Sequence, residues 1–157
     1  MEELIKTMKV TFASEYAYML KAQFYHWNVE GSNFPQYHAL LDTIYSEVQD
    51  KIDEFAENIR KLGTYTPASF ERFSMLSRID DETQIVPADQ MLAELMADSE
   101  KMCEMFKVVF MLSEQANEYG LSDFIAGRQD AHRKHSWMLK ATVSFRLKSS
   151  CPNTARS

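Results

Sequence analysis

A run of regularly spaced apolar residues between positions 34 and 62 limits the fold of this chain more than any other feature. The spacing alternates between three and four residues, which places the side chains on one face of a helix. It therefore predicts a helix over residues 34–62, ended by Gly63. The apolar members are Phe34, Tyr37, Leu41, Ile44, Tyr45, Val48, Ile52, Phe55, Ile59 and Leu62.

Three further segments carry a helical pattern and predict helices over residues 2–28, 88–118 and 122–147, with Gly120 breaking the chain between the last two. The stripe of the first helix consists of Leu4, Met8, Phe12, Tyr16, Met19, Leu20 and Phe24. The whole chain has only four Gly and four Pro in 157 residues, too few for a turn-rich β fold. The sequence therefore predicts an all-α domain over residues 1–147, followed by a flexible tail over residues 148–157.

The connections between the predicted helices indicate how the helices are arranged in space. Residues 28–33 predict a reversal, where Gly31 is free to take a left-handed backbone, Asn33 caps the next helix and Pro35 fits its first turn. The connection between the second and third long helices is much longer and carries one short helix over residues 69–76, capped by Ser69. A connection of this length implies a crossover, which is the connectivity of a ferritin-like four-helix bundle.

Charge and cysteine usage exclude several classes of protein. The net charge of −6 disfavours nucleic acid and favours cations. Cys103 and Cys151 are far apart and form no disulfide framework, so a reducing cytoplasm is expected, with Cys103 as a small buried apolar residue. No stretch approaches the length of a membrane span, and the first residues do not resemble a signal peptide.

Two histidines and three carboxylates share one region of the chain. His26 and His38 flank the reversal, so both rings are expected at the same end of the bundle. Asp42, Asp53 and Glu57 follow His38 by four, fifteen and nineteen residues. At about 100° per residue they lie about 40°, 60° and 100° round the helix from His38, on one broad face. Asp53 and Glu57 also form an i, i+4 pair that suits a hard cation.

The distance along the helix decides how these groups could be used. Fifteen residues place Asp53 about 22 Å from His38, whereas a metal–ligand bond is about 2 Å. One straight helix therefore cannot bring the four groups onto one ion. An antiparallel copy of the helix, related by a two-fold axis, would place His26 and His38 of one chain against Asp53 and Glu57 of the other. The alternative is that the carboxylates belong to a solvated face beside Lys51 and Arg60.

Other polar residues are weaker candidates. His132 and His135 lie one turn apart and could bind a surface metal, but Arg133 and Lys134 beside them favour a solvated face. Asp123 lies at the start of the last long helix, where an acid favours the helix dipole.

Two motifs carry a family resemblance that covers residues 12–147. The run H-W-N-V-x-G-x-x-F-x-x-x-H-x-x-x-D over residues 26–42 resembles the signature of the Dps family, the mini-ferritins called DNA-binding proteins from starved cells. The segment D-x-x-A-E-x-I over residues 53–59 is similar to a second signature of that family, with Asn58 in place of the usual arginine. The run GRQDAHRKHSWMLKA over residues 127–141 is similar to the last helix of the family.

The resemblance implies a ferroxidase that stores iron in a hollow shell of twelve subunits. The family often lines an iron-entry pore with acids from the start of its last helix, which makes Glu118 and Asp123 the candidate pore acids here. It gives His26, His38, Asp53 and Glu57 the role of iron ligands across a two-fold interface, with Asp42 as a supporting carboxylate. Mixed imidazole and carboxylate ligands suit Fe(II) on chemical grounds as well. For Trp27, beside His26, two roles stay open: a trap for oxidising equivalents near the site, or a packing aromatic.

Two competing functions follow from the same resemblance. Some family members compact DNA with lysine-rich tails, but this chain starts with Glu2 and Glu3 and its tail offers only Lys148 and Arg156, so DNA binding is expected to be weak or absent. A di-iron enzyme with its site inside one chain requires Glu-x-x-His motifs. The residues three before the four histidines are Gln23, Pro35, Gln129 and His132, so no such motif exists.

Overall fold

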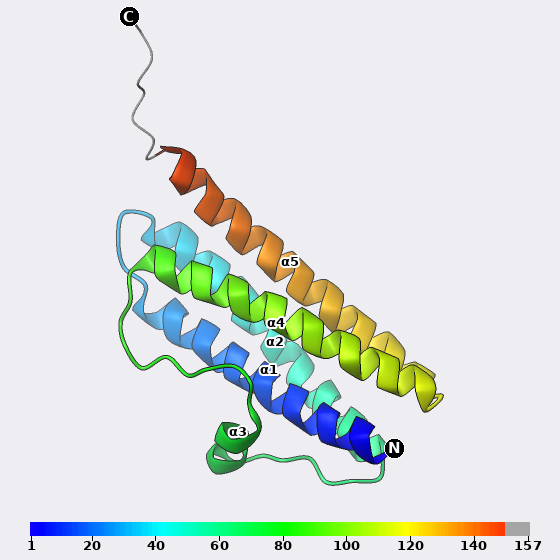
Figure 1. Ribbon diagram of the computed structural model, residues 1–157. Helices are drawn as coiled ribbons and strands as arrows, with labels where there is room; N and C mark the ends of the chain where they lie inside the picture. Colours follow the sequence, from blue (N-terminus) through cyan, green and yellow to red (C-terminus); the bar gives the residue numbers. More distant parts are fainter. Residues whose placement is uncertain (150–157) are drawn as a thin grey trace, which may run out of the picture.

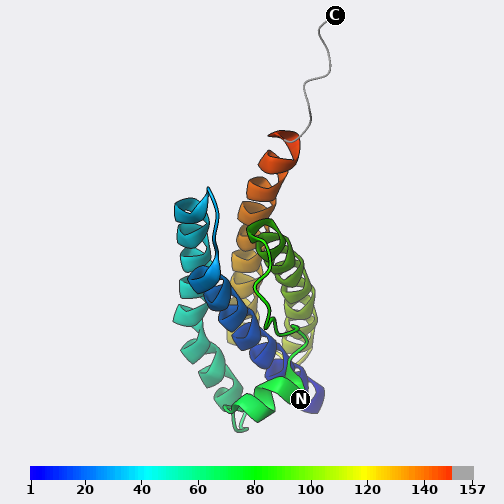
Figure 2. The same ribbon diagram turned by 90° about the vertical axis from the view of Figure 1, so that its left-hand side faces the viewer.

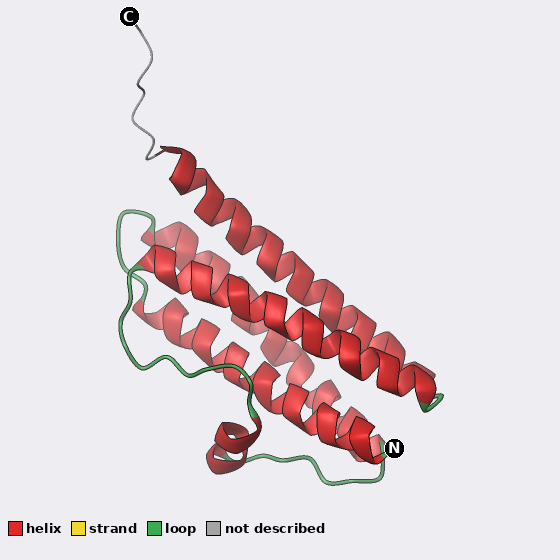
Figure 3. Ribbon diagram, in the orientation of Figure 1, coloured by secondary structure: helices red, strands yellow, loops and turns green. Residues whose placement is uncertain are grey.

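Five helices make up the computed structural model, which describes the backbone of residues 1–149 and the side chains of residues 1–143; no strand occurs in that part of the chain (Figure 3). The helices are α1 (Glu2–Asn28), α2 (Phe34–Lys61), α3 (Phe70–Leu76), α4 (Ala88–Gln115) and α5 (Tyr119–Ser149). The all-α fold and the short helix in the long connection are confirmed.

The four long helices form a bundle of two antiparallel pairs. Figure 1 shows α1 and α2 running in opposite directions, and α4 and α5 running in opposite directions beside them. The connection that carries α3 returns along the outside of the bundle, so α2 and α4 run the same way, as a crossover requires. Figure 2 shows the α1–α2 pair and the α4–α5 pair as two layers.

Each long helix buries a stripe whose members alternate by three and four residues, the spacing of helices that cross at small angles. The α1 stripe is Leu4, Met8, Thr11, Glu15, Tyr18, Ala22 and Tyr25, and the α4 stripe is Leu92, Leu95, Ser99, Met102, Phe106, Val109 and Ser113. Full burial of one large apolar side chain stabilises the fold by about 1.5–3 kcal/mol. The predicted α1 stripe leaves this line after Met8. Of its later members, Phe12 and Met19 are buried beside the line, Tyr16 and Phe24 are half-buried, and Leu20 is 41% exposed.

The reversal between α1 and α2 forms where it was predicted, and Asn33 is at the N-cap position of α2, although its side chain makes no capping hydrogen bond to the first turn. Gly31 has a φ of 118°, a conformation that L side chains rarely adopt. Pro35 lies in the first turn of α2, where its missing N–H costs no hydrogen bond. At the start of α3, Ser69 accepts a hydrogen bond from the backbone N–H of Arg72, the predicted cap.

The predicted break at Gly120 is wrong. α4 ends at Gln115, and Asn117 takes the left-handed conformation with a φ of 60°. Asn tolerates this conformation better than other non-glycine residues do. Gly120 instead lies in the first turn of α5, which starts at Tyr119 and continues to Ser149, beyond both predicted ends. The remainder of the predicted tail, with Cys151, lies outside the described residues.

Candidate functional site

His26 and His38 form a stacked pair at the end of the bundle where α1 meets α2. His26 lies in the last turn of α1 and His38 in the second turn of α2, and the reversal brings their ring centroids to 3.8 Å with 17° between the planes. Phe34 stacks on His38 at 4.9 Å and Tyr45 lies 5.2 Å from His26. The predicted approach of the two rings is confirmed.

Reciprocal hydrogen bonds to the backbone fix how the two rings are oriented. Nδ1 of His26 lies 2.8 Å from the carbonyl oxygen of His38, and Nδ1 of His38 lies 2.7 Å from the carbonyl oxygen of His26. A carbonyl oxygen only accepts, so each Nδ1 carries the hydrogen and donates it. In the neutral rings each Nε2 is then the unprotonated nitrogen. A hydrogen bond of this kind at the second nitrogen is the usual support of a metal-binding histidine.

Asp53 and Glu57 lie on the outward face of α2. Phe55, Asn58 and Ile59 of the same turns point into the bundle, so both carboxylates are exposed. Asp53 also lines a groove of about 770 Å³ that has mostly apolar walls, and its aromatic lining residues are Phe12, Tyr16, Phe70 and Phe73. A carboxylate at the edge of an apolar groove on a single chain suggests a surface that a partner covers.

The two halves of the predicted ligand set stay apart within one chain. α2 is one continuous helix over Phe34–Lys61, which keeps Asp53 about 22 Å from His38 along its axis. Among the described residues, no group of three or more His, Cys, Asp or Glu side chains is arranged to hold a metal ion. Within one chain, the histidine pair and the Asp53/Glu57 pair therefore stay two separate groups, spaced along α2.

The two accessory residues differ in their surroundings. Asp42 is exposed, one turn after His38, and accepts a hydrogen bond of 3.3 Å from Ser46. Trp27 is 62% exposed beside His26, so it is not part of the core of this chain.

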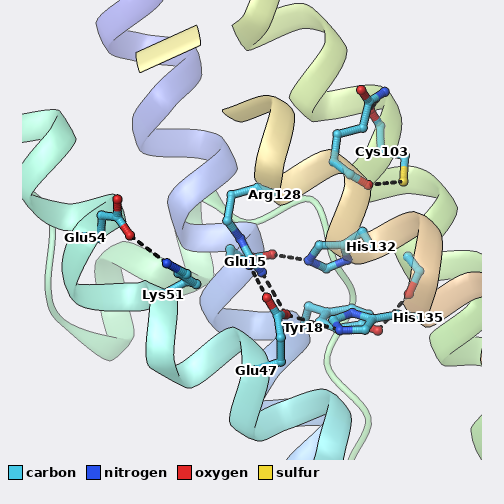
Figure 4. A network of polar contacts seen from close by, with 11 residues as sticks. Glu15, Tyr18, Glu47, Lys51, Glu54, Cys103, Arg128, His132 and His135 are labelled. Atoms are coloured by element: carbon cyan, nitrogen blue, oxygen red, sulfur yellow. Dashed lines mark hydrogen bonds and ion pairs between the residues drawn. The ribbon is translucent and has the colours of Figure 1, made fainter. Parts of the chain in front are cut away.

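A second group of ionisable side chains, here called the bundle-core cluster, lies inside the bundle and consists of Glu15, Glu47, Arg128, His132 and His135 (Figure 4). The guanidinium of Arg128 donates to Glu15 from Nε at 3.1 Å and Nη2 at 2.6 Å, and also to Glu47. His132 Nε2 lies 2.7 Å from Glu15, and His135 Nε2 lies 3.2 Å from Glu47.

This cluster overturns the expectation of a solvated face at His132 and His135. Their exposed fractions are 0% and 2%. Arg133 and Lys134, which suggested exposure, are themselves exposed, but the helix turns the two histidines inward. A sequence signal for this was present: Leu121, Ile125, Arg128, His132, His135 and Leu139 follow the three-and-four spacing of the buried α5 stripe.

The charges of the cluster shift the pKa values of its members. Burial would raise the pKa of Glu47, but hydrogen bonds from His135 and Arg128 outweigh burial and lower that pKa to about 2. Burial would likewise raise the pKa of Glu15, but His132 and Arg128 outweigh it and hold the pKa below its usual value. Burial lowers the pKa of His135.

The remaining candidates have simple surroundings. Cys103 is buried as predicted, and its Sγ lies 3.7 Å from the carbonyl oxygen of Gln129. Glu118 and Asp123 line one pocket of about 240 Å³ at the α4–α5 end, together with Glu54; their role at a pore stays a prediction.

No helix among residues 1–149 combines the length and apolarity that crossing a membrane requires.

Known proteins match this chain over most of its length. The Ferritin family, described as a ferritin-like domain, matches residues 5–146. An uncharacterised low temperature-induced protein of Nostoc sp. is 30% identical over 142 residues, which cover 89% of this chain and 79% of that protein. DNA protection during starvation protein 2 of Bacillus anthracis is 26% identical over 143 residues, which cover 91% of this chain and 98% of that protein.

Solved structures of similar proteins have the same fold. The crystal structure of Dps from Thermosynechococcus elongatus superposes with a TM-score of 0.87 at 25% identity, covering 90% of each chain. The helix order with one crossover, the matched domain and these relatives agree, and the chain belongs to the Dps family of ferritin-like proteins.

Proposed function

We propose that this protein oxidises Fe(II) at sites shared between two chains and stores the ferric product inside a closed shell of twelve copies. The observation that carries the proposal is the pair His26 and His38. Their Nδ1 atoms are fixed by backbone carbonyls, which leaves both Nε2 atoms as ligands, while the candidate carboxylates lie at the far end of α2. The two half-sites complement each other chemically, and only a partner chain can join them.

The four groups suit iron in both oxidation states. Two neutral imidazoles bind Fe(II), and two carboxylates add negative charge that favours Fe(III) once an electron has left. The proposed oxidant is hydrogen peroxide. Two Fe(II) ions give one electron each to one peroxide molecule, whose O–O bond breaks to form two hydroxide ions. The reaction removes peroxide and produces Fe(III), which hydrolyses to mineral in the interior.

A second copy of this chain is the proposed occupant of the groove beside Asp53. The groove has aromatic walls and a carboxylate at its edge. At the other end of α2, Trp27 is 62% and Phe34 is 41% exposed beside the histidine pair. In an antiparallel, two-fold arrangement each chain offers both ends, so two equivalent contacts and two equivalent sites form in one dimer.

Two residues are proposed to assist the shared site. Asp42 adds an exposed carboxylate one turn from His38, where it would support bound iron. Trp27 is adjacent to His26, and its indole would take oxidising equivalents that escape from the iron. The names of relatives such as the starvation protein of Bacillus anthracis support a role in protection against stress. We place this role in the cytoplasm.

Rapid oxidation of Fe(II) tests the proposal. The purified protein, given Fe(II) in the absence of oxygen and then peroxide, should form Fe(III) faster than buffer does, and the product should stay in solution with the protein. A variant with Asp53→Asn and Glu57→Gln should oxidise at least about tenfold more slowly, since loss of even a supporting residue costs tenfold or more at metal sites.

The matched control is Asp50→Asn, which removes an exposed acid from the same helix outside the proposed site. It should keep the rate of the natural protein. The proposal is wrong if the unsubstituted protein oxidises Fe(II) no faster than buffer, or if the Asp50→Asn variant slows as much as the Asp53→Asn/Glu57→Gln variant.

A further inference from the structure

The bundle-core cluster shares no residue with the proposed iron site. Glu15, Arg128, His132 and His135 are each at most 2% exposed. The two carboxylates come from α1 and α2, and the two imidazoles come from one turn of α5, so three helices converge on one point (Figure 4). Buried ion pairs contribute little net stability to a fold. Stability alone therefore does not account for a polar cluster of this size inside a small bundle.

The guanidinium of Arg128 lies between the two carboxylates, and with it in place Glu15, Glu47, His132 and His135 are not arranged as a metal site. It contacts Glu15 and Glu47 together, and Nη2 alone lies 2.6 Å from one carboxylate and 3.2 Å from the other. The imidazole Nε2 atoms contact the same two carboxylates at 2.7 Å and 3.2 Å. Two carboxylates and two imidazoles are a ligand set that Zn²⁺, Co²⁺ and Fe²⁺ accept.

Several buried atoms of the cluster are left without a hydrogen bond. Among the described side chains these include Oε2 of Glu15, both ring nitrogens of His132 and Nδ1 of His135. The 2.7 Å contact between Glu15 and His132 is close enough for a hydrogen bond but does not have the geometry of one. Buried donors and acceptors are nearly always satisfied, so Oε2 of Glu15 and Nε2 of His132, which face each other without a hydrogen bond, are available to a ligand.

We infer that Arg128 is the built-in cation of this cluster and that it keeps divalent metal ions out of a site which Glu15, Glu47, His132 and His135 would otherwise form. With Arg128 in place, a divalent ion meets a positive charge at the centre of the ligand set. Without it, the buried Glu15 and the half-buried Glu47 have lost their counter-charge, and a metal ion bound by these carboxylates and by Nε2 of the two imidazoles replaces that charge. The consequence for iron rests on the proposed function: Arg128 would confine iron to the shared site at the subunit surface.

Replacement of Arg128 by a neutral residue tests this with metals that undergo no redox chemistry here. Arg128→Ala and Arg128→Gln should each bind about one more Co²⁺ per chain than the natural protein, in a site of low coordination number. Bound Co²⁺ in such a site absorbs visible light more strongly than the hydrated ion, so the spectrum reports the ligands directly. Zn²⁺ should raise the melting temperature of both variants by more than it raises that of the natural protein, because the proposed shared site also offers imidazoles and carboxylates and is present in all three.

Three controls separate a metal site from a structural defect. Arg128→Lys keeps a positive charge and should gain no Co²⁺ band. Adding Glu15→Gln and His132→Gln to Arg128→Ala should abolish the band, which places the ion in the core. A variant too unstable to purify is refolded with and without Zn²⁺, and recovery only with Zn²⁺ is the expected result.

The inference is overturned if neither Arg128→Ala nor Arg128→Gln gains a Co²⁺ band or stabilisation by Zn²⁺. A gain that survives the Glu15→Gln and His132→Gln substitutions would also overturn it, since the ion would then lie elsewhere. Neither outcome depends on Fe(II) oxidation, so failure here is distinguishable from failure of the proposed shared site.

Discussion

At the scale of single residues, the histidine pair shows how the backbone prepares a metal ligand. Each ring of His26 and His38 donates Nδ1–H to the carbonyl of the other residue, at 2.8 Å and 2.7 Å. The tautomer is set without any acidic side chain, because a carbonyl at the end of one helix and a carbonyl at the start of the next are both within reach. This arrangement depends on the tight reversal at Gly31.

Glu15 allows a direct prediction of stability. Glu15→Gln keeps the volume of the side chain but leaves the buried Arg128 with less negative charge, and removing one partner of a buried ion pair costs about 3–5 kcal/mol. Urea unfolding followed by circular dichroism measures the loss. Glu104→Gln is the control, since Glu104 pairs with Lys107 on the surface and such pairs contribute at most about 1 kcal/mol. Equal losses in the two variants would contradict this account of the cluster.

The sequence allowed the histidine pair to be predicted but hid the bundle-core cluster, and the reason is physical. His26 and His38 are positioned by a local reversal, which Gly31 and Pro35 signal. The burial of His132 and His135 depends on Glu15 and Glu47, which lie more than eighty residues away in the chain. The three-and-four stripe of α5 was a local signal that His132 and His135 are buried, but their contacts with distant carboxylates leave no mark on any local pattern.

At the scale of the helices, the helix ends could be predicted where a local residue sets them. The start and end of α1 and the position of α3 are as predicted, because Gly31 and Ser69 act locally. The break between α4 and α5 was misplaced because Gly120 is the more obvious breaker, whereas Asn117 takes the positive φ. The choice between two nearby breakers depends on how α4 and α5 pack, which no local pattern reports.

The contacts of α5 with α1 and α2 predict that acid weakens the fold in two stages. Burial lowers the pKa of His135, so its stabilising contribution is complete above the unfolded value of about 6.5 and declines as the pH falls below it. The pKa values of Glu15 and Glu47 are also lowered, that of Glu47 to about 2, so their contribution is complete above about 4.3 and declines as the pH falls towards 2.

Melting temperatures measured between neutral pH and about pH 3 check this prediction. The melting temperature should fall with each stage, and His135→Gln should flatten the first stage while keeping the second. A melting temperature that stays constant down to about pH 4 would contradict the assignment of these groups to the core.

At the scale of the whole molecule, charge argues against a DNA-binding role. Each chain carries a net charge of −6, and every copy in a shell adds the same sign. We expect no retardation of DNA in gels at about 0.15 M salt, where charges separated by more than about 8 Å are screened. The same protein at low salt is the control for weak contacts. A complex that survives about 0.2 M salt would contradict this expectation.

The shared site is the part of the account that one chain reveals least. The sequence spacing of about 22 Å along α2 already excludes a site within one helix. A single chain contains the two groups of the proposed site apart from each other, and the apolar groove beside Asp53 is where we propose that a partner lies. The arrangement of that partner depends on two surfaces at once, so no periodicity within one chain encodes it.

Mixing two inactive variants tests the shared site most directly. One variant carries His26→Ala and His38→Ala, and the other carries Asp53→Ala and Glu57→Ala. Both keep the buried stripes, so both should assemble, and each alone should lose rapid Fe(II) oxidation because every shared site lacks one half.

The two variants are then unfolded, mixed equally and refolded, and the initial rate of Fe(II) oxidation is measured. A mixed dimer has one complete site and one site that lacks all four ligands. With random mixing half of the dimers are mixed, so the rate should return to roughly a quarter of that of the natural protein. Assembled shells that contain both variants and show no return of activity would contradict the shared site, because a site within one chain gains nothing from mixing.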